Sequence, residues 1–288
     1  MNTTVKKIEA LEELLKGGNI TPTIIYNEGW MLRLVLNWLS EHRDKVEHPD
    51  LKFLEKSKWF SEAALPTFFS HENVGEGYET YTHADGVFGD FHCIDGKEYK
   101  GKNYIELDKE CNQFAVIEAK IFSKYSKGNT NGASYNQVAR TIACMYHLAK
   151  TKRITYENLA FYTFLPDYKD QNKKDCDEFM NNNFRKFIRL SDGDDSILGV
   201  VKKRIETVEK NIKDKSKLNN IKNFDIQDFE KFLNSIKIKL IFWEYIIELI
   251  KEVDKGGKTY AEMQLFYNNC KKHNKKEKLS TGQVLRSR

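Results

Sequence analysis

The stretch Phe114-Ala-Val-Ile-Glu-Ala-Lys-Ile-Phe122 decides how we expect this chain to fold. Nine residues, mostly apolar or aromatic and without Gly or Pro, are typical of a buried strand. Side chains two positions apart share one face of a strand, so Glu118 and Lys120 lie side by side. Burying a carboxylate and an ammonium costs desolvation free energy that a partner must offset. A metal site would offer that partner, and a cross-strand ion pair at the edge of a sheet is the alternative.

The composition is that of a globular protein with ample core material, since 40% of the 288 residues are hydrophobic and 31% are charged. Residues 240–250 form the longest apolar segment, which contains two glutamates and is too short to span a bilayer. No apolar run typical of a signal peptide is found near the first residue. We therefore expect a soluble, cytoplasmic protein without a membrane partner.

Several other chemistries are disfavoured by the motifs. The five cysteines are scattered without a CxxC pair, which argues against a zinc site and against a disulfide framework. The chain has no GxxxxGKS phosphate loop, no GxSxG nucleophile elbow and no HxH or HxxxH histidine pair.

Charge is unevenly distributed along the chain. Residues 201–288 hold 21 of the 47 Lys and Arg residues and 12 of the 42 Asp and Glu residues, so this part is net +9 and the remainder net −4. A basic part beside an acidic part is typical of an enzyme that acts on nucleic acid. Lysine-rich helices that only face solvent are the alternative.

Hydrophobic periodicity predicts an α/β fold. We expect a helix over 1–18, a helix that ends at Leu39, an irregular stretch over 40–75, strands over 76–83, 83–94, 114–122 and 159–165, a polar hairpin over 96–112, a helix from Ser134, and helices over 176–190, 196–216, 226–254 and 259–272. This order divides the chain into a core over 1–170 and a basic helical C-terminal region over 171–288.

Two aspartates on the predicted strand 83–94 are candidates to join Glu118. If this strand pairs antiparallel with 114–122, Asp85 lies near Glu118 and Asp90 lies opposite the start of the second strand. Because the two aspartates are five positions apart, they face opposite sides of a regular strand, and position favours Asp85. A bulge at one of the intervening glycines would reverse that choice.

Each flanking helix begins with a polar residue that has two interpretations. Glu28 points along the apolar face of its helix, where it needs a partner, or it is a first-turn glutamate favoured by the helix dipole with Asn27 as N-cap. Gln137 lies at the start of the next helix, close to the strand, or it is the far end of a capping box begun by Ser134.

These residues resemble the PD-(D/E)XK nuclease superfamily in type, order and element. Asp85, the triplet Glu118-Ala119-Lys120 and Gln137 match its pattern, and the resemblance covers about residues 20–166. The chain departs from the family at Ala84, where a proline is expected before the aspartate. The resemblance implies a restriction-endonuclease-like mixed-sheet α/β core flanked by helices, here with a C-terminal helical extension.

The resemblance also implies hydrolysis of phosphodiester bonds with Mg²⁺, for which Mn²⁺ would substitute. Asp85, Glu118 and the backbone carbonyl of Ala119 would be metal ligands. Glu28, which falls where the family's first helix carries a glutamate, would help to bind a second ion or a metal-bound water. Lys120 would orient or deprotonate the attacking water.

Outside the metal ligands, Gln137 would position the lysine or the substrate. Arg140 and Lys124 are candidate substrate-binding residues, with ordinary surface cations as the alternative. The expected partner is nucleic acid, DNA before RNA, in restriction, repair or phage defence, and a homodimer is compatible with this assignment. The alternative is a catalytically inactive nuclease-like module for nucleic-acid binding or assembly.

Overall fold

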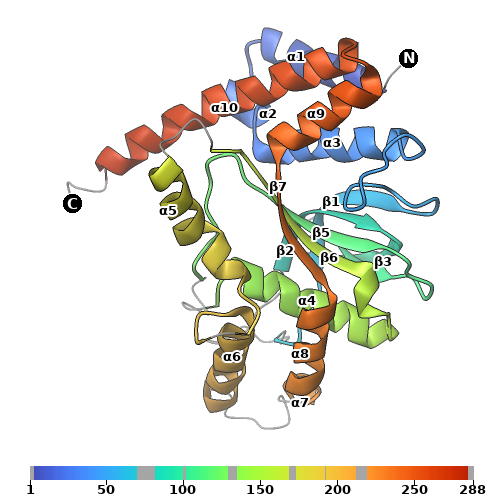
Figure 1. Cartoon of the computed structure of the whole chain (residues 1–288), viewed down its shortest axis with the longest axis vertical. Coiled ribbons are helices and arrows are strands. Elements are labelled where there is room, and N and C mark those ends of the chain that lie inside the picture. Colours follow the sequence, from blue (N-terminus) through green and yellow to red (C-terminus); the bar gives the residue numbers. More distant parts are fainter. Residues whose placement is uncertain are drawn as a thin grey trace.

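A computed structural model describes residues 3–69, 82–99, 102–128, 135–168, 173–191, 193–211 and 219–284. It contains a seven-stranded mixed sheet with the strand order β3-β4-β1-β2-β5-β6-β7. Helices cover both faces of this sheet, and the last helix extends away from it at one end (Figure 1). The predicted α/β class, with a mixed sheet flanked by helices, is confirmed.

The strands are β1 (Lys58–Leu65), β2 (Thr82–Gly89), β3 (Phe91–Tyr99), β4 (Lys102–Leu107), β5 (Phe114–Ala119), β6 (Leu159–Leu165) and β7 (Lys237–Phe242). The helices are α1 (Thr3–Lys16), α2 (Pro22–Ile25), α3 (Glu28–Glu41), α4 (Gln137–Lys152), α5 (Lys173–Asn183), α6 (Ile197–Asn211), α7 (Asn219–Lys222), α8 (Ile226–Ser235), α9 (Trp243–Asp254) and α10 (Lys258–Val284), with short 3-10 turns η1 (Tyr156–Asn158) and η2 (Arg185–Ile188). Strand β2 runs antiparallel to β1 and β5, whereas β5, β6 and β7 run parallel.

Strand β5 lies inside the sheet and is buried along its whole length. Phe114 and Val116 pack in the hydrophobic cluster that includes α4, and Ala115 and Ile117 pack in the cluster that includes α3. This alternation follows from the two-residue period of a strand. Glu118, two positions after Val116, therefore belongs to the face covered by α4.

Three sequence predictions in the sheet were wrong. Residues 226–254, predicted as one helix, form α8, β7 and α9, so the region 171–288 adds an edge strand to the sheet. The stretch 40–75, predicted as irregular, contains β1. The predicted strand 83–94 is two strands, β2 and β3, that separate after Gly89. Of the predicted strand 76–83, the part before Thr82 lies outside the described residues.

Gly89 explains that separation. Its φ of 133° is a conformation that side chains disfavour, and a Cβ there would lie 2.0 Å from the carbonyl oxygen of Gln113. Only glycine lets the chain leave β2 at this point while the backbone of Gln113 approaches. The amide of Asp90 then donates to the same carbonyl at 2.7 Å.

The end of β5 is held from the C-terminal region. The indole Nε1 of Trp243, the first residue of α9, donates to the carbonyl oxygen of Lys120 at 2.9 Å. Trp243 is fully buried and makes an edge-to-face contact with Phe164 of β6, with ring centroids 5.2 Å apart. Strand β7 leads directly into this tryptophan.

Candidate functional site

Asp85 and Glu118 meet where β2 and β5 stop pairing. The register of these strands pairs Gly86 with Ile117, and one further step places Asp85 opposite Glu118. There the amide of Ala119 donates to Oδ2 of Asp85 at 2.8 Å, in the place of a backbone acceptor. Because the N–H and C=O of a strand residue point to the same neighbouring strand, the Ala119 carbonyl is also directed toward β2.

A distortion in β1 accompanies this arrangement. Strand β1 pairs Ser61 with Gly86 and Ala63 with Ala84, and Glu62 between them has a φ of 61°. A glutamate in the left-handed region is strained, and such strain clusters at functional sites. The distortion lies on the strand beside Asp85, at the point where its carboxylate accepts from β5.

Glu118 and Lys120 form a buried pair with Asp85 beside it. The ammonium of Lys120 lies 2.5 Å from Oε1 of Glu118 and 3.8 Å from Oδ2 of Asp85. Glu118 is 1% exposed and Lys120 is 5% exposed. Because β5 is an interior strand with an acid opposite, this pair is not the edge ion pair that was the alternative interpretation.

Gln137 completes the first layer around Glu118. Its Nε2 donates to Oε1 of Glu118, and its Oε1 accepts from the amide of Ser126 at 3.2 Å. The N-cap of α4 is Asn136, which accepts from the amide of Ala139, so Gln137 does not close the capping box proposed for it. Ser134, the other end of that box, lies outside the described residues.

The other oxygen of Glu118 has no partner. Oε2 is buried and accepts no hydrogen bond in the described part of the chain. Burial, and next the negative charge of Asp85, raise the pKa of Glu118 to about 8, because together they outweigh the attraction of Lys120. Burial alone lowers the pKa of Lys120, but the carboxylates of Glu118 and Asp85 outweigh it, so the net direction is upward and the amine stays protonated.

Glu28 is turned toward the chain that follows β5. Asn27 is the N-cap of α3, as predicted, and accepts from the amide of Trp30 at 3.0 Å. Oε2 of Glu28 accepts from the amide of Ile121 at 2.9 Å, and the hydroxyl of Ser123 lies 2.9 Å from each carboxylate oxygen. Glu28 thus holds the segment that starts directly after Lys120.

Asp85 opens into a cavity of about 450 Å³ at the ends of β1 and β2. Its carboxylate is 26% exposed, so it connects the buried pair with this cavity. The sequence did not point to three other residues of the lining: Arg33, Glu62 and Asn274. Glu62 pairs with His83 at 3.0 Å and with Arg33 at 3.7 Å. A lone arginine in the apolar sequence of α3 was the one available signal.

Asp90, the competing aspartate, has a structural role at the other end of β2. Its Oδ1 accepts from the hydroxyl of Ser57 at 3.2 Å and its Oδ2 from the amide of Asn112 at 2.9 Å. It is 4% exposed. Asp85 is therefore the aspartate that lies beside Glu118.

The two candidate substrate-binding residues lie apart from these contacts. The ammonium of Lys124 lies 5.6 Å from the ring centre of Phe179, and the buried Nε of Arg140 has no hydrogen-bond partner. Within the described residues, neither forms a hydrogen bond or ion pair with Asp85, Glu118 or Lys120.

The donor atoms at Asp85 and Glu118 fit a hard divalent cation. In the part of the chain that the structure describes, no group of three or more His, Cys, Asp or Glu is placed to hold a metal ion. Magnesium, however, typically takes one or two carboxylates and keeps several waters. The unpartnered, buried Oε2 of Glu118, the carboxylate of Asp85 and the carbonyl of Ala119 are oxygen donors of that kind.

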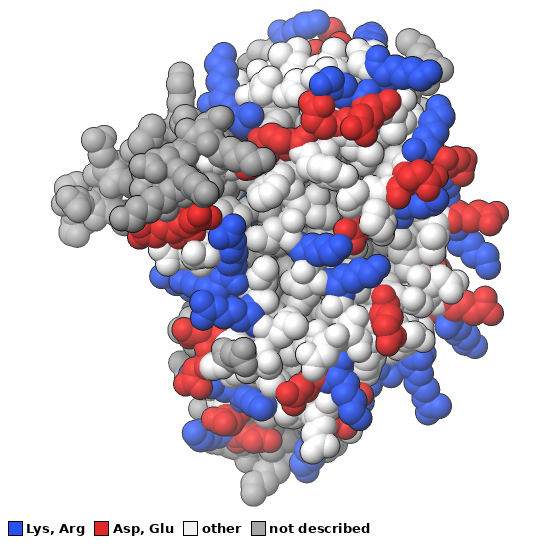
Figure 2. All heavy atoms as spheres, in the orientation of Figure 1, with Lys and Arg blue, Asp and Glu red and all other residues white. Residues whose placement is uncertain are grey.

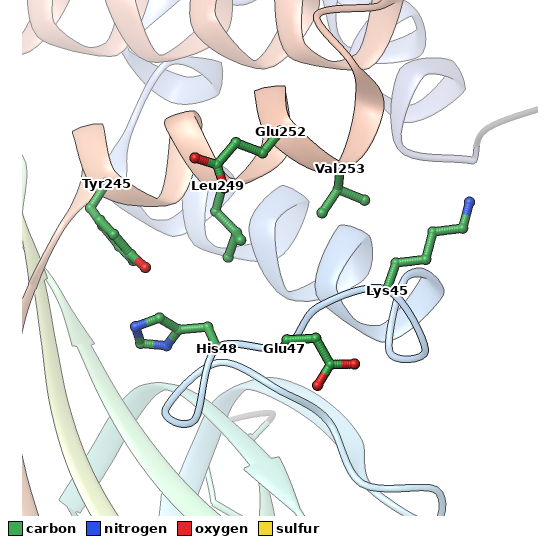
Figure 3. Close-up of a pocket in the computed structure, with 7 residues that line it drawn as sticks. All are labelled: Lys45, Glu47, His48, Tyr245, Leu249, Glu252 and Val253. Carbon is green, nitrogen blue, oxygen red and sulfur yellow. The ribbon is translucent and has the colours of Figure 1, made fainter.

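A second hollow, of about 470 Å³, lies between α9 and the connection from α3 to β1 (Figure 3). The rings of His48 and Tyr245 are 5.1 Å apart across it. Lys45 points away from the hollow toward solvent in the same view. It shares no lining residue with the cavity at Asp85, and we assign no function to it.

Comparisons of the chain with protein-family models, with curated proteins and with solved structures find no match. Within the described ranges, no helix combines the length and the apolar character needed to cross a membrane.

Proposed function

We propose that this chain is a metal-dependent nuclease that hydrolyses phosphodiester bonds, most simply those of DNA. One observation carries the proposal: two carboxylates and one ammonium converge at the ends of β2 and β5, and the buried Oε2 of Glu118 has no partner. Their types and order are those of the PD-(D/E)XK superfamily, which the sequence resembles.

The roles follow from the contacts. Asp85, Glu118 and the carbonyl of Ala119 would hold Mg²⁺ or Mn²⁺, and Gln137 fixes the carboxylate of Glu118 by donating to Oε1. A divalent cation, when bound, lowers the pKa of a water molecule and neutralises charge on the phosphate. Glu28 keeps the chain after Lys120 in place, and it remains a candidate for holding a metal-bound water.

The protonation state of Lys120 favours one of its two predicted roles. Glu118 and Asp85 raise its pKa against the effect of burial, so the group is an ammonium at neutral pH. An ammonium donates hydrogen bonds and offsets negative charge, but it does not accept a proton. Lys120 is therefore proposed to orient the attacking water and the phosphate, and not to deprotonate the water.

The test is cleavage of linear, circular and single-stranded DNA and of RNA with Mg²⁺, Mn²⁺, Ca²⁺ or a chelator. We expect Mg²⁺-dependent cleavage that Glu118→Gln and Lys120→Ala each abolish while the melting temperature stays close to that of the unmodified chain. The matched controls are Glu248→Gln and Lys251→Ala, which change an exposed ion pair of the same residue types at 2.9 Å. Undiminished cleavage by both site variants would overturn the proposal.

A second candidate is a nuclease-like module that binds nucleic acid without cutting it. The observation in its favour is that Lys120 lies against both Glu118 and Asp85, so the charges are partly closed on themselves. Retention of nucleic acid at low salt, together with no cleavage of any of the four substrates, would select this candidate.

A further inference from the structure

The segment formed by α5 and η2 packs on the connection that follows β5 through aromatic rings. The ring of Tyr125 lies 5.3 Å from that of Phe184 and 5.7 Å from that of Phe187. Phe179 of α5 joins the group, 6.0 Å from Phe184. This cluster attaches a part of the chain from beyond residue 170 to the loop that begins directly after Lys120.

Two lysines lie over the rings of this cluster. The ammonium of Lys124 is 5.6 Å from the ring centre of Phe179, and that of Lys186 is 4.9 Å from the ring centre of Phe187. Lys127 is exposed on the same connection. We call Lys124, Lys127 and Lys186 the basic shelf. Contact with a ring face orients an ammonium without neutralising its charge.

The basic shelf keeps its positive charge. In the described part of the chain, none of its three lysines has a carboxylate within ion-pair distance. Other lysines of the same net charge do: Lys203 pairs with Asp194 at 2.7 Å, Lys251 with Glu248 at 2.9 Å and Lys258 with Glu9 at 2.6 Å. Three uncompensated ammonium groups on one local surface are a binding feature for an anion with several charges.

Two hydrogen-bond links connect the basic shelf with Glu118. Between Lys124 and Lys127, the amide of Ser126 donates to Gln137, whose Nε2 donates to Glu118. In addition, the hydroxyl of Tyr125 bonds to that of Thr163, the residue paired with Glu118 in the β5–β6 register. The shelf therefore lies beside the candidate site, on the face of the sheet covered by α4.

We propose that the basic shelf binds the phosphate backbone of a nucleic-acid strand on one side of the phosphate that is cleaved. This inference rests on the proposed function and adds the path of the substrate. Figure 2 shows Lys and Arg side chains gathered over the place that α5 and the chain after β5 occupy in Figure 1. Regularly spaced phosphates match separate, oriented ammonium groups, and phosphate contacts position a strand without reading its sequence.

The experiment compares two triple variants with the same change in net charge. One is Lys124→Gln/Lys127→Gln/Lys186→Gln, and the control is Lys203→Gln/Lys251→Gln/Lys258→Gln. Fluorescence anisotropy measures binding of labelled duplex and single-stranded DNA in the presence of Ca²⁺ or a chelator, over roughly 50–200 mM salt. Thermal melting of each variant verifies that the fold is kept, since all six lysines lie at the surface.

The shelf variant is expected to lose about tenfold or more in affinity at low salt, and the control less than about twofold. Each phosphate contact contributes about 0.9 to the slope of log K against log salt for duplex and about 0.7 for single strands. Loss of three contacts therefore lowers the slope by about 2–3. The larger of the two slope changes, scaled by these factors, identifies the strand form that the shelf prefers.

An equal loss in both variants would show that only net charge matters and would overturn the proposal, as would unchanged affinity and slope in the shelf variant. Binding that depends on the shelf, with no cleavage by the unmodified chain, would refute the nuclease proposal and leave the shelf in place. Cleavage that persists together with unchanged binding by the shelf variant would refute the shelf alone.

Discussion

The hydroxyl of Ser123 lies 2.9 Å from both carboxylate oxygens of Glu28, 95 residues earlier in the chain. Glu28 also accepts from the amide of Ile121, so its contacts flank Phe122, whose φ is 119°. A non-glycine residue in such a conformation costs about 1–3 kcal/mol, and it persists only when its surroundings enforce it. Helix α3 thereby fixes the path of the chain directly after Lys120.

We expect Glu28→Ala to lower the free energy of unfolding by about 2 kcal/mol, because it leaves the Ile121 amide and the Ser123 hydroxyl without their acceptor. Ser123→Ala alone should cost about 1 kcal/mol. The double variant should cost less than the sum, because both changes remove one shared interaction. Urea unfolding of the four proteins measures this, and strict additivity would contradict the coupling.

The two aspartates of the β2 region should separate stability from activity. Asp90→Ala removes the acceptor of two buried donors, so we expect a loss of about 1–3 kcal/mol in unfolding free energy. Asp85→Asn keeps an oxygen for the Ala119 amide and should change stability by less than about 1 kcal/mol, yet abolish Mg²⁺-dependent cleavage. Unfolding curves and cleavage rates of both variants check this, and a fully active Asp85→Asn protein contradicts it.

The buried carboxyl of Glu118 predicts a pH dependence of stability. Its folded pKa of about 8 lies above its ordinary value of 4.5, so between these values the folded state holds a proton that the unfolded state has lost. The stability contribution of protonated Glu118 is complete below about pH 4.5 and is lost as the pH rises through 8. The total is at most on the order of 4 kcal/mol.

Glu118→Gln should remove this dependence, so the difference in unfolding free energy between variant and unmodified chain should grow from pH 5 to pH 8 in the presence of a chelator. Added Mg²⁺ should stabilise the unmodified chain at pH 8, because a bound cation favours the ionised carboxylate, and should not stabilise the variant. Parallel stability profiles for the two proteins, with and without Mg²⁺, would speak against the site.

Trp243→Phe tests the bond to the end of β5. The phenyl ring keeps much of the packing against Phe164, but it cannot donate to the Lys120 carbonyl. We expect a loss of about 1–3 kcal/mol in unfolding free energy and a lower rate of cleavage with an unchanged metal requirement. Leu249→Ala, on the same helix, is the control for changes at α9 that do not contact β5. Equal rates for Trp243→Phe and the unmodified chain would contradict the expectation.

The candidate site was more readable from the sequence than the edges of the sheet. Strand β5 is interior, so its apolar run is continuous, and the placement of Asp85 beside Glu118 required only antiparallel pairing. Strand β7 was missed although Ile238 and Leu240 alternate with lysines. It continues without a turn residue into α9, whose apolar residues have helical spacing.

Other features depend on backbone geometry that residue types do not encode. Strand β1 buries only its last three residues, two of which are alanines, so its pattern is weak. The left-handed φ of Glu62 and its contacts with Arg33 and His83 arise from the distortion of β1 and have no sequence motif. The role of Asn136 as N-cap depends on where α4 begins, which differs by three residues from the predicted start.

Because β7 and Trp243 come from the last quarter of the sequence, the order of synthesis matters for the site. When the ribosome has completed β6, the nascent chain already contains Asp85, Glu118 and Lys120, but the carbonyl of Lys120 has no indole to hold it. At about 5–20 residues per second, Trp243 follows roughly 4–16 seconds later. During translation, strand β6 is thus a temporary sheet edge, and the arrangement at Lys120 is completed only as the nascent chain nears full length.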